Sequence, residues 1–180
     1  MRVSVKIGLL FAAIFIVIKL AFYFSNNLLD ELQPFVILNM VLLTSSIGLA
    51  IYKENRSVDK LGNFFDDVKL GMRTGLPYSI LVSVFLFFYY NNIYPDFAEN
   101  KVNQIKDELK KKEKIEEIRD SNDALSNRSD DEIRNQMIEN TTAMYSPKFT
   151  LVVSLLGLTL FSVINSILLA LIIRKVIFRI

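Results

Sequence analysis

The sequence contains no cysteine and no histidine among its 180 residues. Their absence excludes disulfide bonds, zinc sites of the usual Cys/His kind, thiol nucleophiles, haem ligation by histidine and the most common general base. The acidic pairs Asp66-Asp67 and Asp130-Asp131 do not extend into a metal or nucleotide motif, and there is no phosphate-binding glycine loop. We therefore expect no catalytic residues, no metal and no cofactor, and a protein that is not an enzyme.

The chain also lacks a large excess of charge of one sign. Its 21 basic and 19 acidic side chains leave a net charge of +2. The electrostatic field of the whole chain therefore does not indicate a nucleic-acid partner. Hydrophobic residues make up 52% of the chain and gather in long runs. This composition is typical of an integral membrane protein, which makes the lipid bilayer the first expected partner.

Four apolar runs are long enough to cross a membrane, which takes about 20 helical residues. They cover residues 7–24, 35–52, 76–94 and 149–173. The stretch "KLAFYFSNN" after the first run offers no small-x-small cleavage site, so we interpret that run as an uncleaved signal anchor. The predicted fold class is an all-α integral membrane protein with four transmembrane helices and both termini on one side.

The distribution of lysine and arginine predicts the orientation of these spans. The N-terminus, the link between the second and third spans and the C-terminus together carry ten basic residues, whereas the short loop "SNNLLDELQ" carries none. The long segment 96–148 has ten basic and thirteen acidic residues, and long segments translocate with little regard to charge. We expect cytoplasmic termini and place residues 96–148 on the far side of the membrane.

Two stretches outside the spans have helical patterns. Within residues 59–73, an apolar stripe of Leu61, Phe64, Phe65, Val68 and Met72 predicts an amphipathic cytoplasmic helix, which lies either on lipid headgroups or against the spans. Residues 96–146 predict a helical hairpin between spans three and four. Its first helix runs over 96–119, and a capping box of Ser129 and Glu132 opens the second.

Lys19 is the one full charge inside a predicted span, and such a residue is a functional hypothesis by default. It lies near the outer end, where its stem can snorkel or its ammonium can pair with Asp30, Glu31 or Asp96. Small and polar residues mark two further helix faces, which we interpret as packing faces and, alternatively, as a pore lining. These residues are Asn39, Ser46, Ser154, Gly157, Ser162 and Asn165.

The order of these parts resembles a known family. The stretch "NFFDDVKLGMRTG" leads into a span that ends "FFYYNNIYPDF", and a charged segment, "MYSP" and a last span ending "SVINSILLALIIRK" follow. This resembles the domain of unknown function 4199 family, small four-span proteins typical of Bacteroidota. The resemblance rests mainly on Gly71, Arg174-Lys175 and the membrane-exit joint Tyr94, Pro95, Asp96 and Phe97. It implies a bacterial inner-membrane location, with residues 96–148 periplasmic, and no established activity.

At the membrane-exit joint, Pro95 suits the first turn of a new helix or a kink, and Asp96 suits a cap or first-turn acid. The leading hypothesis for function is a non-enzymatic scaffold or accessory subunit of a membrane complex, with a protein partner or a second copy of the chain. The alternatives are a small oligomeric transporter or channel that uses Lys19, Asn39 and Asn165, and a helper of envelope glycan or lipid synthesis.

Overall fold

The computed structural model describes residues 2–56, 63–122, 125 and 127–178, and over these ranges the regular structure is helical. Four helices are long and apolar enough to cross a membrane. The chain divides into two compact units, residues 1–85 with 151–180 and residues 86–150. The span helices are α1 (Val3–Phe24), α2 (Gln33–Arg56), α3 (Phe64–Phe88) and α7 (Pro147–Ile172), which continues as the π-helix η3 (Ile173–Phe178).

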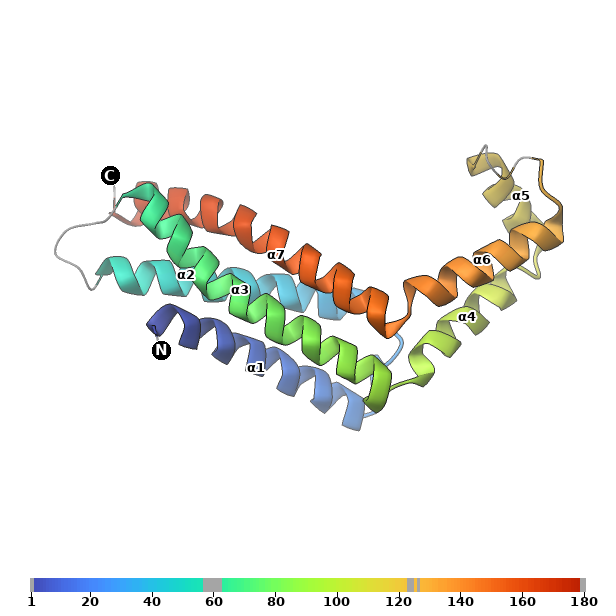
Figure 1. Ribbon diagram of the computed structural model, residues 1–180, viewed down its shortest axis with the longest axis horizontal. Coiled ribbons are helices and arrows are strands. Elements are labelled where there is room, and N and C mark those ends of the chain that lie inside the picture. The colour runs from blue at the N-terminus through green and yellow to red at the C-terminus, as the bar shows by residue number, and fades with distance from the viewer. Residues whose placement is uncertain (1, 57–62, 123–124, 126, 179–180) are drawn as a thin grey trace. The chain divides into compact units, whose positions relative to one another are not determined.

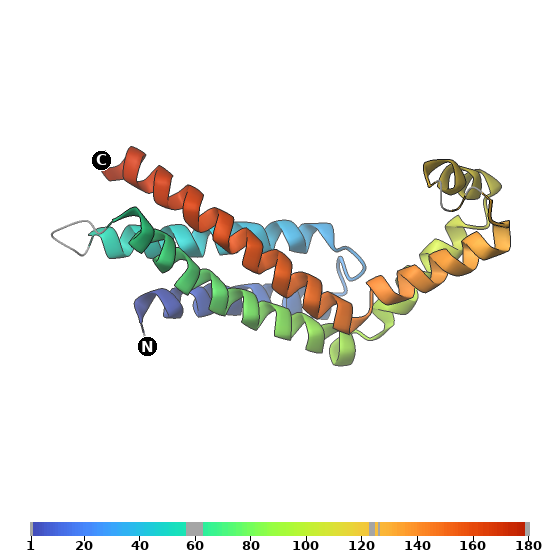
Figure 2. The same ribbon diagram turned by 45° about the horizontal axis from the view of Figure 1, so that its top comes forward.

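The first unit is a bundle of the four long helices, and both chain termini lie at one end of it, beside the end of α2 and the start of α3 (Figures 1 and 2). This placement agrees with an even number of crossings. In lipid no water is available to the backbone N–H and C=O groups, so each long, predominantly apolar run forms a helix, which satisfies these groups internally. Fully buried Phe15, Leu43, Ile47 and Val82 lie in the interior, whereas many outward side chains are apolar and exposed, which is compatible with lipid contact.

Close helix contacts in this bundle occur at glycines. A Cβ on Gly8 of α1 would lie 2.1 Å from the backbone oxygen of Thr74 in α3. On α3, a Cβ on Gly71 would lie 2.5 Å from the hydroxyl of Ser166, and one on Gly75 would lie 1.8 Å from that of Ser162. Small residues allow helix backbones to approach closely inside a membrane, where packing replaces the hydrophobic effect.

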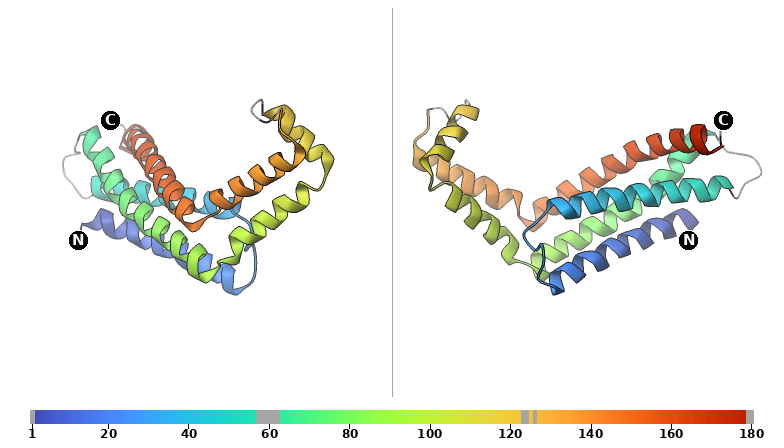
Figure 3. Two further views of the ribbon diagram at one scale, coloured as in Figure 1. Left: turned by 45° about the vertical axis from the view of Figure 1, so that its right-hand side comes forward. Right: turned by 180° about the vertical axis from the view of Figure 1, so that it is seen from behind.

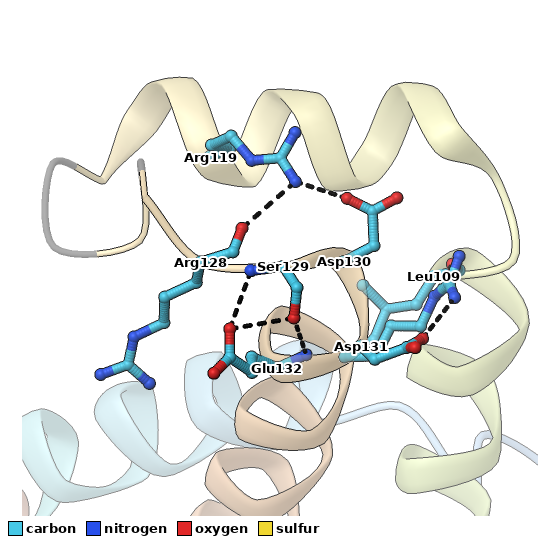
Figure 4. A network of polar contacts seen from close by, with 8 residues as sticks. Leu109, Arg119, Arg128, Ser129, Asp130, Asp131 and Glu132 are labelled. Carbon is cyan, nitrogen blue, oxygen red and sulfur yellow. Dashed lines mark hydrogen bonds and ion pairs between the residues drawn. The ribbon is translucent and has the colours of Figure 1, made fainter.

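The second unit contains η1 (Tyr89–Ile93), a single π-helical turn, and the helices α4 (Asp96–Glu108), α5 (Lys112–Ser121) and α6 (Asp130–Met144) (Figure 3). Its core is an apolar cluster of Leu109, Ile115, Leu125 and Ile133. The predicted capping box at the start of α6 is confirmed: the Ser129 hydroxyl accepts from the Glu132 N–H, and the Glu132 carboxylate accepts from the Ser129 N–H (Figure 4).

The prediction of one continuous helix over 96–119 is wrong. The chain leaves helical geometry between Glu108 and Lys112, and two helices result. The sequence pattern has the same break, because Ile115 is out of phase with Ile105 and Leu109 on a straight helix. Turning the chain at 109–111 brings Ile115 and Leu109 into one core.

The predicted boundary between the amphipathic segment 59–73 and the third span 76–94 is not a break. Helix α3 runs without interruption from Phe64 to Phe88 with Pro77 inside it. Proline lacks the N–H that would bond to the carbonyl four residues earlier, a loss that helices in membranes tolerate. From Phe64 onward, the predicted amphipathic segment and the third candidate span are therefore parts of one helix.

Candidate functional site

Lys19 is buried in the first unit, at the contact between α1 and α2. Its side chain is 1% exposed, and the ammonium lies 3.5 Å from the centroid of the Phe35 ring. Phe22 meets the same ring edge-to-face, with 5.5 Å between the centroids. Gly8, Ala12, Phe15 and Lys19 all lie on the buried face of α1, as their spacing predicts. The ammonium contacts an aromatic face, a cation–π geometry that gains strength when water is excluded.

Two side-chain hydrogen bonds join α2 to other helices of the bundle. The Tyr78 hydroxyl of α3 donates to the Asn39 side-chain oxygen of α2 at 2.7 Å. The Thr44 hydroxyl of α2 donates to the side-chain oxygen of Asn165 in α7 at 3.1 Å, and the Asn165 amide donates to the Phe161 carbonyl. The two asparagines predicted as intramembrane polar residues thus tie α2 to α3 and α2 to α7.

The predicted small-residue faces divide into buried and outward members. Ser46 and Ser162 are fully buried, and the Ser46 hydroxyl donates to the Leu43 carbonyl. Ser162 contacts the helix at Gly75, and within the described residues its hydroxyl has no hydrogen-bond partner. Ser154 donates to the Leu151 carbonyl within α7, and a Cβ on Gly157 would meet nothing within 4 Å. Ser162 and Asn165 therefore mark the packed side of α7, and Gly157 faces outward.

An ion pair joins α3 to the end of the last span. Arg174 in η3 donates through Nε to the Asp67 carboxylate at 2.5 Å, and the two side chains are 16% and 4% exposed. The face of α3 that carries Asp67, Leu70 and Gly71 is buried. The predicted stripe lies elsewhere: Phe65 is 68% exposed, and Leu61 is outside the described residues.

The predicted membrane-exit joint lies in the second unit and has an aromatic core. Pro95 occupies the N-cap position of α4, and Asp96 is its first residue, in the first-turn position that suits an acid. Phe97 is 2% exposed and stacks 4.5 Å from the Tyr90 ring, and the Tyr94 hydroxyl accepts from the Asn100 amide. The joint is a packed aromatic corner at the start of α4.

Several residues of the bundle interior have no local signal in the sequence. Tyr78 and Thr44 are hydrogen-bond partners that have no distinctive local pattern. The Asp67–Arg174 pair joins residues 107 positions apart, and no local spacing predicts such a contact. Gly71 and Gly75, by contrast, are four residues apart, and this small-xxx-small spacing is a recognisable packing signal.

The arrangement of side chains is chiefly one that holds helices together. Within the described parts of the chain, no group of three acidic, histidine or cysteine side chains is placed to hold a metal ion. Among known sequences and structures, neither the curated proteins nor the solved structures include a match to this chain. A profile of the family described as "Protein of unknown function (DUF4199)" matches residues 6–175. The chain therefore belongs to the DUF4199 family.

Proposed function

We propose that this membrane protein is a non-enzymatic scaffold or accessory subunit of a membrane complex. The observation that carries the proposal is that polar side chains inside the spans bond to other helices of the bundle. Asn39, Thr44, Tyr78 and Asn165 bond from helix to helix, and Asp67 pairs with Arg174. The outward faces remain apolar, which suits docking of another membrane helix as well as lipid.

The proposed location is a bacterial inner membrane, with both termini cytoplasmic and residues 96–148 periplasmic. The basic residues that flank the spans support this orientation. Both termini lie at the same end of the first unit, which also suits it (Figure 1). A partner subunit, or a second copy of the chain, would dock on exposed span faces or on the segment between spans three and four.

Site-specific photocrosslinking tests the scaffold proposal in intact membranes. A photoreactive phenylalanine analogue replaces one exposed apolar residue on each span helix, at Val17, Val41, Ile80 or Leu160. A docking partner produces a reproducible protein adduct from one or two of these faces and none from the others, which act as internal controls. Adducts with lipid alone at all four positions would contradict the proposal.

A transporter or channel is the second candidate, and the burial of Lys19 favours it. A charge that is 1% exposed inside an apolar bundle is costly to maintain, and intramembrane charges commonly mark transport pathways. Flux of ions or small solutes into proteoliposomes should then fall on Lys19→Met and on Asn165→Leu. Flux equal to that of protein-free vesicles in the unmodified chain would rule this candidate out.

A helper role in envelope glycan or lipid synthesis is the third candidate. Phe65 on the predicted amphipathic stripe is exposed, and the stripe differs from the buried face of α3. Such a surface suits contact with lipid-linked substrate that a separate enzyme uses. Deletion of the gene should then cause a lipid-linked precursor to accumulate, and Phe65→Glu should fail to reverse the effect.

A further inference from the structure

A pocket in the second unit lies outside the polar contacts described above. It is lined by residues at the end of α4 and on the facing side of α6, and its volume is about 380 Å³. This volume lies within the range of small-molecule sites, about 300–1,000 Å³. The lining residues are Lys106, Leu109, Lys110, Arg134 and Ile138.

The charge of this lining is one-sided. Three of its five side chains are cationic and none is acidic. The surrounding segment 96–148 has the opposite balance, with ten basic and thirteen acidic residues. Cations are thus concentrated in the concave part of an otherwise acidic segment, and a concave cationic site favours an anionic ligand.

Arg134 is held in place by the end of α4 and by its own helix, α6. Its Nε donates to the Leu109 carbonyl at 3.3 Å, and a terminal nitrogen donates to the Asp131 carboxylate at 3.1 Å. Figure 4 shows Leu109 and Asp131 beside the start of α6. A guanidinium fixed in this way presents planar donors, the geometry that binds phosphate and carboxylate oxygens with two parallel bonds.

The carboxylates that already pair with the pocket cations compete only weakly with an anionic ligand. Asp131 is 86% exposed, and Lys110 and its partner Asp107 are 76% and 72% exposed. Exposed pairs of this kind contribute little because water and salt screen them. The partial negative charge at the end of α4, about half an elementary charge, also opposes an anion, but it is smaller than the net positive charge that remains when the three cations are set against the carboxylates of Asp107 and Asp131.

The apolar part of the pocket gives it a fixed wall. Leu109 is 3% exposed and belongs to the core cluster with Ile133, and Ile138 packs against that cluster. The three cationic groups come from α4, from the turn that follows it and from α6, and they match the three free oxygens of a phosphate monoester better than the two oxygens of a carboxylate. We propose that this pocket binds a phosphate group, carried either by a lipid headgroup or by a soluble molecule. This inference does not depend on the scaffold role.

Binding to the full-length protein tests the proposal with two probes. The first is inorganic phosphate, titrated by calorimetry against detergent-solubilised protein. The second is phosphatidic acid in phosphatidylcholine nanodiscs, and native mass spectrometry measures the lipid that stays bound to the protein.

The variants are Arg134→Gln and the double variant Lys106→Gln with Lys110→Gln. The double variant leaves the Arg134–Leu109 bond in place, so it keeps the test valid if Arg134→Gln weakens folding. Arg128→Gln is the charge-matched control, because Arg128 lies in the same unit outside the pocket.

We expect each pocket variant to weaken binding at least about tenfold, because a charge-assisted hydrogen bond to phosphate is lost, whereas Arg128→Gln binds like the unmodified chain. If the pocket variants weaken the binding of both inorganic phosphate and phosphatidic acid, a soluble phosphate is sufficient as ligand. If only phosphatidic acid binds the unmodified protein and the variants weaken that binding, the ligand is a lipid headgroup. The proposal is overturned if neither probe binds the unmodified protein. It is equally overturned if the control weakens binding as much as the pocket variants do.

Discussion

Gly8 carries only a hydrogen where α1 meets the backbone of α3. A methyl group there would lie 2.1 Å from the Thr74 oxygen, and a backbone oxygen inside a helix cannot rotate away. At Gly157 the same methyl group meets nothing within 4 Å. The two glycines therefore differ in function although both lie in apolar helices.

We predict that Gly8→Ala destabilises the protein by about 1–3 kcal/mol, the usual cost of overpacking a close contact. Gly157→Ala should cost nothing, and the better helix propensity of alanine adds up to about 1 kcal/mol of stability. Thermal unfolding of the detergent-solubilised variants measures the difference. Equal unfolding temperatures for the two alanine variants would show that α1 does not approach α3 this closely.

At the scale of the element, an ion pair between Asp67 and Arg174 links α3 to η3. Arg174→Gln leaves the Asp67 carboxylate buried without its cation, and removing one partner of a buried pair costs about 3–5 kcal/mol. We expect a loss toward the lower end, because Arg174 is 16% exposed. The double variant with Asp67→Asn should recover part of the loss, since no charge remains buried. Chemical unfolding of the single and double variants forms the cycle, and purely additive effects would contradict a direct pair.

The capping box at the start of α6 makes a contribution to folding stability that depends on pH. The Ser129 backbone N–H and hydroxyl donate to the Glu132 carboxylate at 2.8 and 2.9 Å, and these bonds lower its pKa below the ordinary glutamate value. The folded state binds this proton less readily than the unfolded state. Its stabilisation is therefore complete above the ordinary pKa of about 4.3 and is lost as the pH falls through the lowered value.

Carboxyl carbon NMR on the glutamate-labelled protein measures this pKa directly. We expect the Glu132 resonance, assigned by its absence in Glu132→Gln, to titrate below the ordinary glutamate value. Ser129→Ala should move the midpoint upward because the hydroxyl bond is removed. An unchanged midpoint in Ser129→Ala would mean that the capping box does not form in solution.

At the scale of the whole molecule, the prediction concerns which ends face which compartment. The native chain has no cysteine, so single cysteines report accessibility without background. We expect a membrane-impermeant maleimide to label Asn103→Cys in spheroplasts, whereas Glu54→Cys becomes labelled only after lysis. Both positions are exposed. The opposite labelling pattern would reverse the proposed orientation.

Much of the architecture was predictable from composition and run length. Four long, predominantly apolar runs form helices in lipid, because no water is present to bond to an open backbone. The capping box at Ser129 and Glu132 is a local signal within four residues, and it was predicted correctly. The break between α4 and α5 leaves only a change of phase at Ile115 in the sequence, and local spacing does not distinguish this from one continuous helix.

The contacts that organise the interior needed the packed helices. Lys19 was recognisable as an intramembrane charge, but its place over the Phe35 ring depends on how α1 lies against α2. Asn39 and Asn165 were recognisable as polar residues, and their partners Tyr78 and Thr44 were not, because those partners come from other helices. Helix formation is governed by neighbours in the chain, whereas the partners of a buried polar group are set by which helix faces meet.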